Sequence, residues 1–464
     1  MQHINLKLLF FLLGAMLLGF SACSDNFLAI EPDDTIPVEE FIKTPADAQE
    51  VLNGSYKALS SKYAMGGSSQ FLAEIMADNI SNYRITGDWL SHYTWTTDIF
   101  LGTTRDLMLN SFRVANRANF LLEHLDDIAD LSAAEKQRMR GEALFLRAIP
   151  HFECVRFFGQ AYGSTADNSQ LGIAIRTTFG NDIVNRSSVG QVYDQVIADL
   201  NEAITLLPES QDVYADKWAA KGYLAKVYFQ MNKFQEAYDL ANDVISNGGF
   251  TLEPDLSKRF GGGTTGESVF EITSASLNDN SNNGFRDTYR VDPSTGFAPV
   301  YLSADIFGAA TANPNDLRGQ LWYKLNALNN VECTKFSTTA PINIPIVHLT
   351  ELKLIRAESA AELGMEDAAI QDINDIRTRA GIEPVAVGTT LADLITYIRQ
   401  ERRLELVGEG NRLHELKRQA VRDNSNLLVR GIAPWNCNGL VCQLPDNELK
   451  GNPDMEPNPS GGCQ

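Results

Sequence analysis

The spacing of apolar residues along the chain predicts an antiparallel pair of helices between residues 111 and 159. In the first helix, residues at three- and four-residue steps form one face; they are Phe112, Ala115, Asn119, Leu122 and Leu125. In the second helix, the corresponding face consists of Met139, Ala143, Leu146 and Ile149. Ser132 and Glu135 form a capping box at its start, and Pro150 predicts a kink or a break inside it.

A second pair of helices is predicted for residues 216–246, with a turn near Met231 and Asn232. Small residues such as Gly222 allow two helices to approach closely, which is typical of a tetratricopeptide hairpin. Residues 349–381 repeat this plan with Gly364 at the turn, and residues 189–207 form a further amphipathic helix. The pattern therefore predicts a mostly α fold of tetratricopeptide-like helical hairpins.

Two long stretches, residues 68–104 and 248–345, interrupt this helical pattern. Both are rich in Gly, Asn, Ser and Thr and show no helical period over long runs. Long irregular loop insertions between helical repeats commonly carry the binding surface. We therefore expect the helices to be the scaffold and these two stretches to recognise the ligand.

The N-terminus has the layout of a bacterial lipoprotein signal. An apolar run follows Lys7, is far shorter than the roughly 20 residues that cross a bilayer, and ends in Ser21, Ala22 and Cys23. We expect residues 1–22 to be a signal peptide, Cys23 to be lipidated, and residues 23–40 to be a tether. The protein would then be anchored by lipid in the outer membrane. The alternative is an ordinary signal peptide cut near Ala22.

The charge of the chain argues against nucleic acid as a partner. Its 39 Lys and Arg residues against 59 Asp and Glu residues give a net charge of −20, which repels phosphate backbones. One of the six cysteines is assigned to lipid, so an odd number remains and a full disulfide framework is not implied. Cys437 and Cys442 are close enough in sequence to pair around a turn, and this pairing is left open.

Motifs for catalysis are sparse. The chain has no His-Glu-x-x-His, Cys-x-x-Cys or Gly-x-Ser-x-Gly pattern, and the GGGTTG stretch at residues 261–266 is followed by Glu267 where a phosphate loop needs Lys. The adjacent Asp126 and Asp127 point about 100° apart on a helix and cannot flank one glycosidic bond together. Their position on a solvated helix face explains Asp126 and Asp127 better than catalysis does. We expect no enzyme activity and no metal site.

A charged stretch near the C-terminus predicts an ion-pair network. Its members are Glu401, Arg402, Glu405, Glu409 and Arg412. At a spacing of four residues they are expected to form ladders of opposite charge that lock the helix onto the body.

Several segments together resemble the SusD/RagB family over nearly the whole mature chain. They include GEALFLRAIPHFECVRFFG at residues 141–159, IRQERRLELVGEGNRLHELKR at residues 398–418 and LPDNELKGNPDMEPNP at residues 444–459. The resemblance implies one SusD-like domain over residues 41–464, in a surface lipoprotein that binds nutrient, most often oligosaccharide or polysaccharide. It also implies delivery to a SusC-like TonB-dependent outer-membrane barrel.

Two alternatives to oligosaccharide capture stay open. One is a peptide-capture lid of the same architecture, and the other is a lipid-anchored glycoside hydrolase. No cofactor is expected, although a structural calcium ion in the loops is left open.

Sugar binding needs flat aromatic faces for stacking, with polar side chains nearby for the hydroxyls. The predicted ligand-binding residues from the two loop regions are Asp78, Asn79, Tyr83, Trp89, Tyr93, Arg286, Tyr289 and Arg290. In proteins of the family that this chain resembles, the two regions meet on one face. Trp89 follows Gly87 and Asp88 in a predicted turn and is the best candidate for a stacking platform. Trp95 and Trp322 are expected to be buried.

Overall fold

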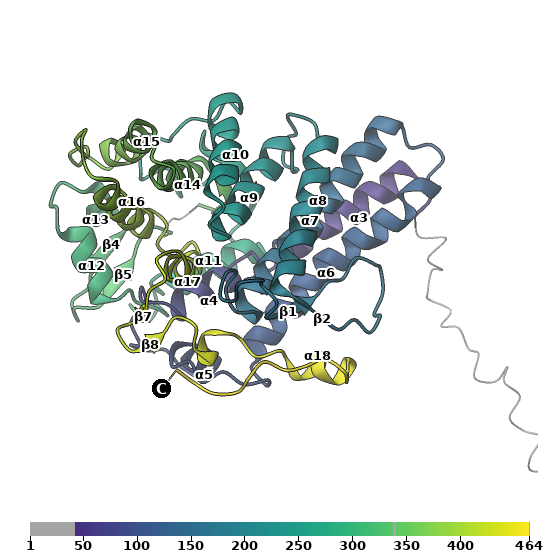
Figure 1. Cartoon of the computed structure of the whole chain (residues 1–464), viewed down its shortest axis with the longest axis horizontal. Helices are drawn as coiled ribbons and strands as arrows, with labels where there is room; N and C mark the ends of the chain where they lie inside the picture. The colour runs from purple at the N-terminus through teal and green to yellow at the C-terminus, as the bar shows by residue number, and fades with distance from the viewer. Residues whose placement is uncertain (1–41, 337–339, 464) are drawn as a thin grey trace, which may run out of the picture.

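The computed structural model describes residues 42–336 and 340–463 (Figure 1). The predicted signal peptide, the lipidation site Cys23 and the tether at residues 23–40 lie outside the described residues. Within the described residues, no helix combines the length and the apolar character that crossing a membrane requires.

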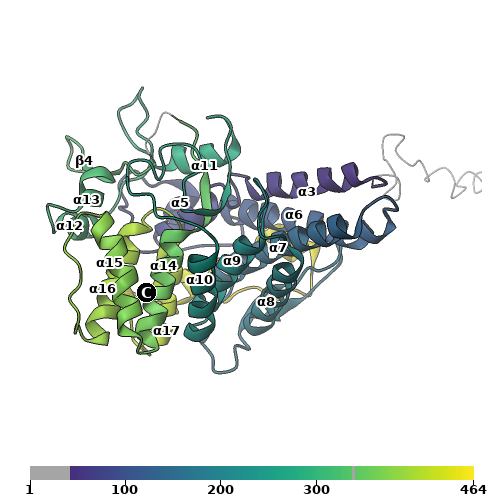
Figure 2. The same cartoon turned by 90° about the horizontal axis from the view of Figure 1, so that it is seen from above.

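Helices that follow one another in the chain pack side by side and form the scaffold (Figures 1 and 2). In order they are α3 (Pro45–Leu59), α6 (Gly102–His124), α7 (Ala133–Phe158), α8 (Val189–Leu206), α9 (Lys217–Gln230), α10 (Phe234–Asn247), α14 (Leu349–Glu362), α15 (Glu366–Arg379) and α16 (Leu391–Glu405). Helices α17 (Arg412–Arg422) and α18 (Asp446–Gly451) and the 3-10 turns η2 (Leu125–Asp127) and η3 (Asn438–Leu440) complete this part. The predicted mostly α class is confirmed.

The hairpins form where the sequence predicts them. Helix α9 ends at Gln230 and α10 begins at Phe234, so the turn includes Met231 and Asn232, and the α14–α15 turn contains Gly364. Gly222 allows the close approach of α9 to its neighbours, because a Cβ there would lie 2.5 Å from Val347 Cγ1. The small residue at position 222 therefore lets strand β6 (Ile344–His348) and helix α14 pack closely against α9.

The first predicted pair corresponds to α6 and α7. The capping box is confirmed: Ser132 Oγ accepts from the backbone N–H of Glu135, and the Glu135 side chain accepts from the Ser132 N–H. Pro150 does not end the helix, which continues to Phe158, so the predicted break is wrong. Proline removes one backbone hydrogen bond, and the buried residues on both sides of Pro150 hold the helix in place through packing.

The two insertions contain more regular structure than the sequence pattern predicts. Short helices occur in both: α4 (Ser68–Ile75), α5 (Gly87–Tyr93), α11 (Asn280–Tyr289), α12 (Ala304–Thr311) and α13 (Leu317–Leu321). Strand β3 (Ser268–Ile272) pairs with β6 (Ile344–His348), and β4 (Tyr323–Leu325) pairs with β5 (Val331–Cys333), both antiparallel. Helices this short do not produce a sustained period, which is why the pattern missed them.

Two further antiparallel pairs of short strands lie outside the insertions. Strand β1 (Leu171–Ala174) pairs with β2 (Arg186–Ser188), and β7 (Leu428–Val429) pairs with β8 (Ala433–Pro434).

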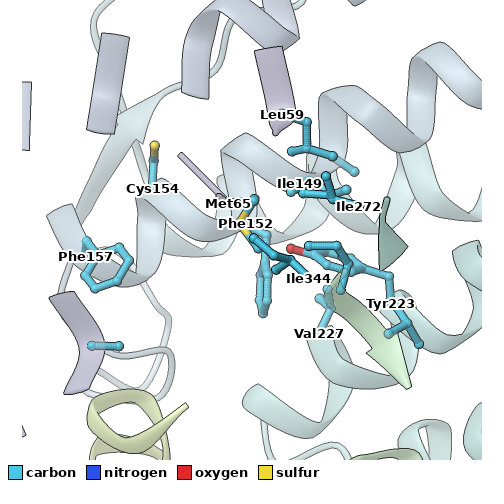
Figure 3. Packing of buried hydrophobic residues seen from close by; sticks show 14 of the residues in the cluster. Leu59, Met65, Ile149, Phe152, Cys154, Phe157, Tyr223, Val227, Ile272 and Ile344 are labelled. Carbon is cyan, nitrogen blue, oxygen red and sulfur yellow. The ribbon is translucent and has the colours of Figure 1, made fainter. Parts of the chain in front are cut away.

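The hydrophobic core runs through the helical scaffold into the insertions. Figure 3 shows Ile149 and Phe152 of α7 close to Tyr223 of α9 and Ile344 of β6. Tyr223 is fully buried, and its hydroxyl donates to Glu153 Oε1 at 2.9 Å. Trp95 and Trp322, at 5% and 2% exposed, are buried as predicted. A smaller cluster joins α14, α15 and α16.

A buried ion cluster centred on Glu405 joins α16 to other parts of the chain. The fully buried Glu405 carboxylate lies 3.0 Å from Arg259 Nη1, 3.1 Å from Arg318 Nη1 and 2.9 Å from Arg379 Nη2. Burial by itself would raise the pKa of Glu405, but these three guanidinium groups lower it below its usual range.

Neighbouring acids extend this cluster. Glu409 lies 2.9 Å from His348 Nε2 and 2.5 Å from Lys335 Nζ. Burial opposes its ionisation, yet the charges of Lys335 and Arg259 hold the pKa of Glu409 well below its usual value. The predicted network is confirmed, but not as ladders along one helix. The partners come from other elements, because Glu401, Glu405 and Glu409 are like charges at a spacing of four.

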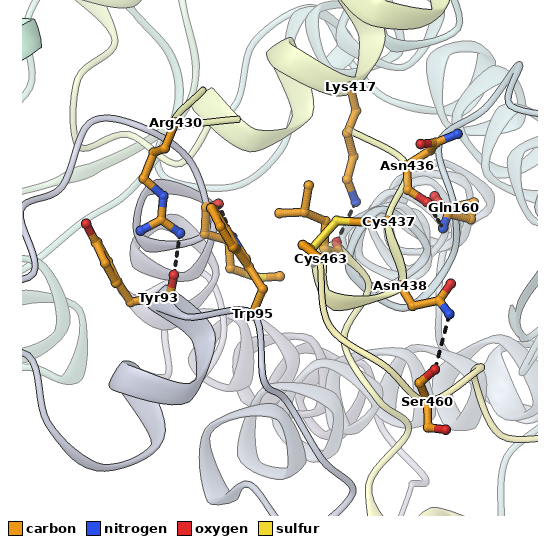
Figure 4. Close-up of a disulfide and its surroundings, with 12 residues drawn as sticks. Tyr93, Trp95, Gln160, Lys417, Arg430, Asn436, Cys437, Asn438, Ser460 and Cys463 are labelled. Atoms are coloured by element: carbon orange, nitrogen blue, oxygen red, sulfur yellow. Dashed lines mark hydrogen bonds between the residues drawn. A yellow bond between two sulfur atoms is a disulfide. The ribbon is translucent and has the colours of Figure 1, made fainter. Parts of the chain in front are cut away.

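One disulfide ties the C-terminal tail to the loop after β8. Cys437 pairs with Cys463, close to Trp95 and Arg430 (Figure 4). Cys442 is a buried free thiol whose sulfur lies 3.9 Å from Met76 Sδ. The pairing of Cys437 with Cys442, which the sequence left open, is therefore wrong, since Cys442 points into the core.

Acid is expected to weaken the fold through Glu405 and Glu409. Both carboxyls have a lowered pKa in the folded chain, so their stabilisation is complete above the ordinary Glu pKa of about 4.3 and is lost as the pH falls through the lowered values. Urea unfolding midpoints measured from about pH 7 down to about pH 3 test this.

Two variants distinguish the contribution of the buried Glu405 cluster from that of an exposed surface carboxylate. Glu405→Gln is expected to lower the free energy of unfolding by about 3–5 kcal/mol at neutral pH, because buried cations lose their partner. Glu209→Gln, at a largely exposed carboxylate, should leave it nearly unchanged. Equal midpoints for both variants would contradict the role given to Glu405.

Replacing both Cys437 and Cys463 by Ser is expected to lower the free energy of unfolding by about 3 kcal/mol. The disulfide spans 26 residues of sequence, and closing such a loop restricts the unfolded chain. Urea unfolding of both proteins without reductant measures the difference. Reductant should destabilise the parent protein and leave the double variant unchanged; a double variant as stable as the parent would count against this role.

Candidate ligand-binding groove

The two insertions meet at a groove of about 460 Å³. One wall comes from residues 62–71, a second from residues 84–89, and the third from residues 284–300. The prediction that these regions of the chain share a face is therefore confirmed, although the first wall begins before residue 68.

Close backbone contact holds the first and third walls together. A Cβ on Gly284 of α11 would lie 1.7 Å from the carbonyl oxygen of Gly66, and a Cβ on Gly67 would lie 2.5 Å from Gly284 Cα. No side chain fits between these two segments. The two walls can therefore lie this close together only because these glycines carry no side chain.

Backbone hydrogen bonds join the same two insertions beside the groove. Ser81 N–H donates to the Tyr301 carbonyl at 2.9 Å, and Ser303 N–H donates to the Asn79 carbonyl at 2.7 Å. Because these bonds involve the main chain, the junction does not depend on which side chains face the groove. The walls are therefore supported independently of the residues that line them.

The aromatic part of the groove consists of Tyr63, Phe71 and Trp89. Trp89 lies in the first turn of α5, so its predicted position in a non-helical turn is wrong. Its indole is half-buried and forms a T-shaped pair with Phe71, with ring centroids 4.6 Å apart. This packing fixes the ring at the groove wall, which suits a stacking platform.

Two cationic side chains line the groove without a carboxylate partner. The Arg84 guanidinium lies 4.5 Å from the centre of the Phe297 ring, and Lys62 Nζ lies 5.0 Å from the centre of the Tyr63 ring. In the described part of the chain, neither forms an ion pair. Asp287, the acid on the lining, lies 3.3 Å from Arg286 Nη2.

Asp78 and Asn79 are engaged in contacts within the protein. Asp78 accepts two hydrogen bonds from Arg412, at 2.6 and 2.8 Å, and this pairing outweighs burial and lowers the pKa of Asp78. Asn79, at 1% exposed, donates to Glu74 at 2.9 Å and accepts from Arg403 at 2.9 Å. Both residues attach the insertion to the scaffold, and we leave them out of the groove.

Three other predicted ligand contacts lie away from the groove lining. Tyr289 is 2% exposed and Arg286 is 9% exposed, so the first is a core residue and the second is a buried partner of Asp287. Tyr93 lies near the disulfide, where the guanidinium of Arg430 sits 3.8 Å from its ring centre (Figure 4). We leave these residues out as well.

Tyr83 and Arg290 lie near the groove. Tyr83 is 41% exposed, and its ring centroid is 5.6 Å from that of Tyr301. Arg290 lines an adjoining recess of about 330 Å³ that shares Asp287 and Pro299 with the groove. With Trp89, these two are the predicted ligand-binding residues that the structure leaves within reach of a bound molecule.

Sequence reasoning missed Lys62 and Tyr63 as groove residues. They follow α3 in the stretch SSKYAMGGSS, before the predicted insertion begins. The Gly-rich turn with an exposed aromatic ring was the available signal, and Tyr63 is 41% exposed.

A second groove of about 350 Å³ lies between α6 and α18. The ion pair of Arg176 with Glu448, at 2.7 Å, joins two of its walls, and the Arg176 guanidinium lies 5.8 Å from the Phe112 ring centre. Phe112, the aromatic ring of this second groove, is therefore already covered on one side by the Arg176 cation.

No group of three or more His, Cys, Asp or Glu side chains is placed to hold a metal ion within residues 42–336 and 340–463. Asp126 and Asp127 are exposed and pair with Lys136 at 3.1 Å and His124 at 3.4 Å. These two acids therefore belong to a solvated face, as predicted.

Similar proteins were found by sequence and by structure. Residues 26–229 match the family described as starch-binding associating with outer membrane, and residues 308–460 match the SusD family. "SusD-like protein P2" of Formosa agariphila is 24% identical, with 96% of this chain and 98% of that protein covered. "SusD-like protein P38" of the same organism is also 24% identical, with 98% of each chain covered.

Solved structures give the same result. A SusD superfamily protein from Bacteroides thetaiotaomicron superposes with a TM-score of 0.80 at 25% identity, covering 90% of this chain and all of that one. A SusD-like carbohydrate binding protein from Bacteroides vulgatus superposes with a TM-score of 0.70 at 22% identity, covering 82% and 84%. The sequence matches in both halves of the chain agree with the helical fold, and the chain belongs to the SusD/RagB family.

Proposed function

We propose that this protein is a lipid-anchored outer-membrane protein that captures an oligosaccharide in the groove and delivers it to a SusC-like TonB-dependent barrel. The observation that carries the proposal is the half-buried Trp89 indole on a groove lined by free cations and hydroxyls. A pyranose ring stacks on such a surface while its hydroxyls take hydrogen bonds from the rim. The family match to starch-binding proteins supports this ligand class.

The mechanism in this proposal is reversible binding without chemistry. Glycoside hydrolysis needs two carboxyl groups on either side of the scissile bond. Among the described residues on the groove lining, Asp287 is the one carboxylate, and Arg286 holds it. A captured sugar would therefore leave the groove unchanged.

Delivery of the ligand to a barrel requires a site that binds and releases it without large rearrangement. The close contact of Gly66 and Gly67 with Gly284 and the backbone bonds between the insertions hold the walls before any ligand arrives. A preformed site avoids the cost of ordering loops on binding, so modest contacts give useful affinity while release stays fast. The proposed anchor at Cys23 would keep the groove near the membrane.

A peptide-capture lid remains the second candidate from the sequence. It would depend on unpaired backbone groups along the groove, whereas sugar capture would depend on the aromatic ring of Trp89 on the lining. The first experiment runs the soluble form, starting after Cys23, against a panel of polysaccharides and peptide mixtures. Retardation by one glycan without released products supports the proposal. Released sugar products would indicate a hydrolase, and retention of peptides alone would indicate the peptide lid.

Trp89→Ala is expected to weaken binding of the retained glycan by about one to two orders of magnitude, since stacking on an aromatic ring contributes roughly 1–3 kcal/mol. Affinity electrophoresis or calorimetry measures the change. Trp435→Ala is the matched control, because Trp435 is also half-buried but is not on the groove lining. Unchanged affinity in a folded Trp89→Ala variant would refute the stacking role.

Gly284→Ala is expected to widen the groove and weaken glycan binding. The added Cβ would overlap the Gly66 carbonyl, so the walls must separate, at a cost of about 1–3 kcal/mol in the free energy of unfolding. Thermal unfolding and glycan affinity are measured together. Gly308→Ala, on α12 with open space around the new Cβ, is the control. Parent-like affinity and stability for Gly284→Ala would show that the contact does not set the groove.

A further inference from the structure

The charge of the groove differs in sign from the charge of the chain. The chain carries a net charge of −20, yet the groove lining presents Lys62 and Arg84 with no carboxylate within ion-pair distance in the described part of the chain. The lining acid, Asp287, is already paired with Arg286. The lining beside Trp89 therefore presents two positive groups and one acid that is already paired.

Arg84 is held in place by its backbone and its ring contact. Its φ of 67° lies in the left-handed region, which non-glycine residues adopt rarely and often at binding sites. The Ile85 N–H donates to the Asn82 carbonyl at 3.2 Å across this turn, and the guanidinium rests over Phe297. Its hydrogen-bond donors are thus positioned in advance without being used by an acid of the protein.

The adjoining recess adds one cation beside two acids. Arg290 lines it beside Asp287 and Pro299, which also line the groove. The second acid of this recess, Asp292, accepts from the backbone N–H and the hydroxyl of Ser294, at 2.8 and 2.7 Å. A chain-like ligand that continues from the groove into the recess would meet Arg290, a third cation, while both acids of the recess are held by contacts within the protein.

We propose that the groove takes an anionic oligosaccharide, with a sugar ring on Trp89 and a carboxylate or sulfate group between Lys62 and Arg84. This inference rests on the proposed capture function. A planar guanidinium binds carboxylate and sulfate oxygens in pairs of hydrogen bonds, and such charged hydrogen bonds are stronger than those to neutral hydroxyls. Local cations are also what an acidic protein needs to bring a polyanion close, because its overall charge repels that ligand.

The test uses the soluble form starting after Cys23 and three probes: polygalacturonate for carboxylates, a sulfated galactan for sulfates, and starch as the neutral glycan. We expect retention of at least one anionic probe, and the probe retained identifies the group. Arg84→Gln and Lys62→Gln should each weaken that binding about tenfold. Lys324→Gln changes an exposed cation that is not on the groove lining and should leave this binding unchanged.

Salt gives a second measurement on the same proteins. Raising the salt concentration from about 50 mM to about 500 mM should weaken binding of the anionic probe to the parent protein, and should weaken it less for Arg84→Gln. If neither anionic probe is retained, the inference is overturned. Retention of starch in a Trp89-dependent manner would then keep the capture function and reject only the charge preference.

Discussion

The buried charge cluster around Glu405 is the interaction on which the arrangement of the molecule depends. Helix α16 supplies Glu401 and Glu405, and the arginines that meet them come from the scaffold helix α15 and from the second insertion. A buried network of this kind adds little net stability over an apolar core, but it tolerates very few alternative arrangements. It therefore specifies where a long insertion lies on the scaffold.

The same region of the chain also attaches the first insertion. Arg403, two residues before Glu405, donates to Asn79, and Arg412 at the start of α17 binds Asp78. Both insertions are thus positioned relative to α16 and α17, the second through the Glu405 cluster and the first through these two arginines. The scaffold helices contribute no residue to the lining of the groove, yet they determine its geometry.

Features that depend on local spacing could be predicted from the sequence. The capping box at Ser132 and the hairpin turns at Asn232 and Gly364 belong to this class. Features that depend on contacts between distant segments could not. The helical position of Trp89, the burial of Tyr289 and the choice of Cys463 over Cys442 follow from how the insertions and the tail fold back, and no spacing within one segment encodes that.

The glycine contact between the groove walls has a consequence for how such a site evolves. Gly66, Gly67 and Gly284 fix the distance between the walls through backbone alone, so no side chain that faces the ligand carries this task. Lys62, Tyr63 and Arg84 are exposed and lie outside the buried core. Exchanging them costs the fold little, because exposed side chains contribute little to stability. Under the proposed function, substitutions at the rim can therefore change which ligand is bound while the frame stays constant.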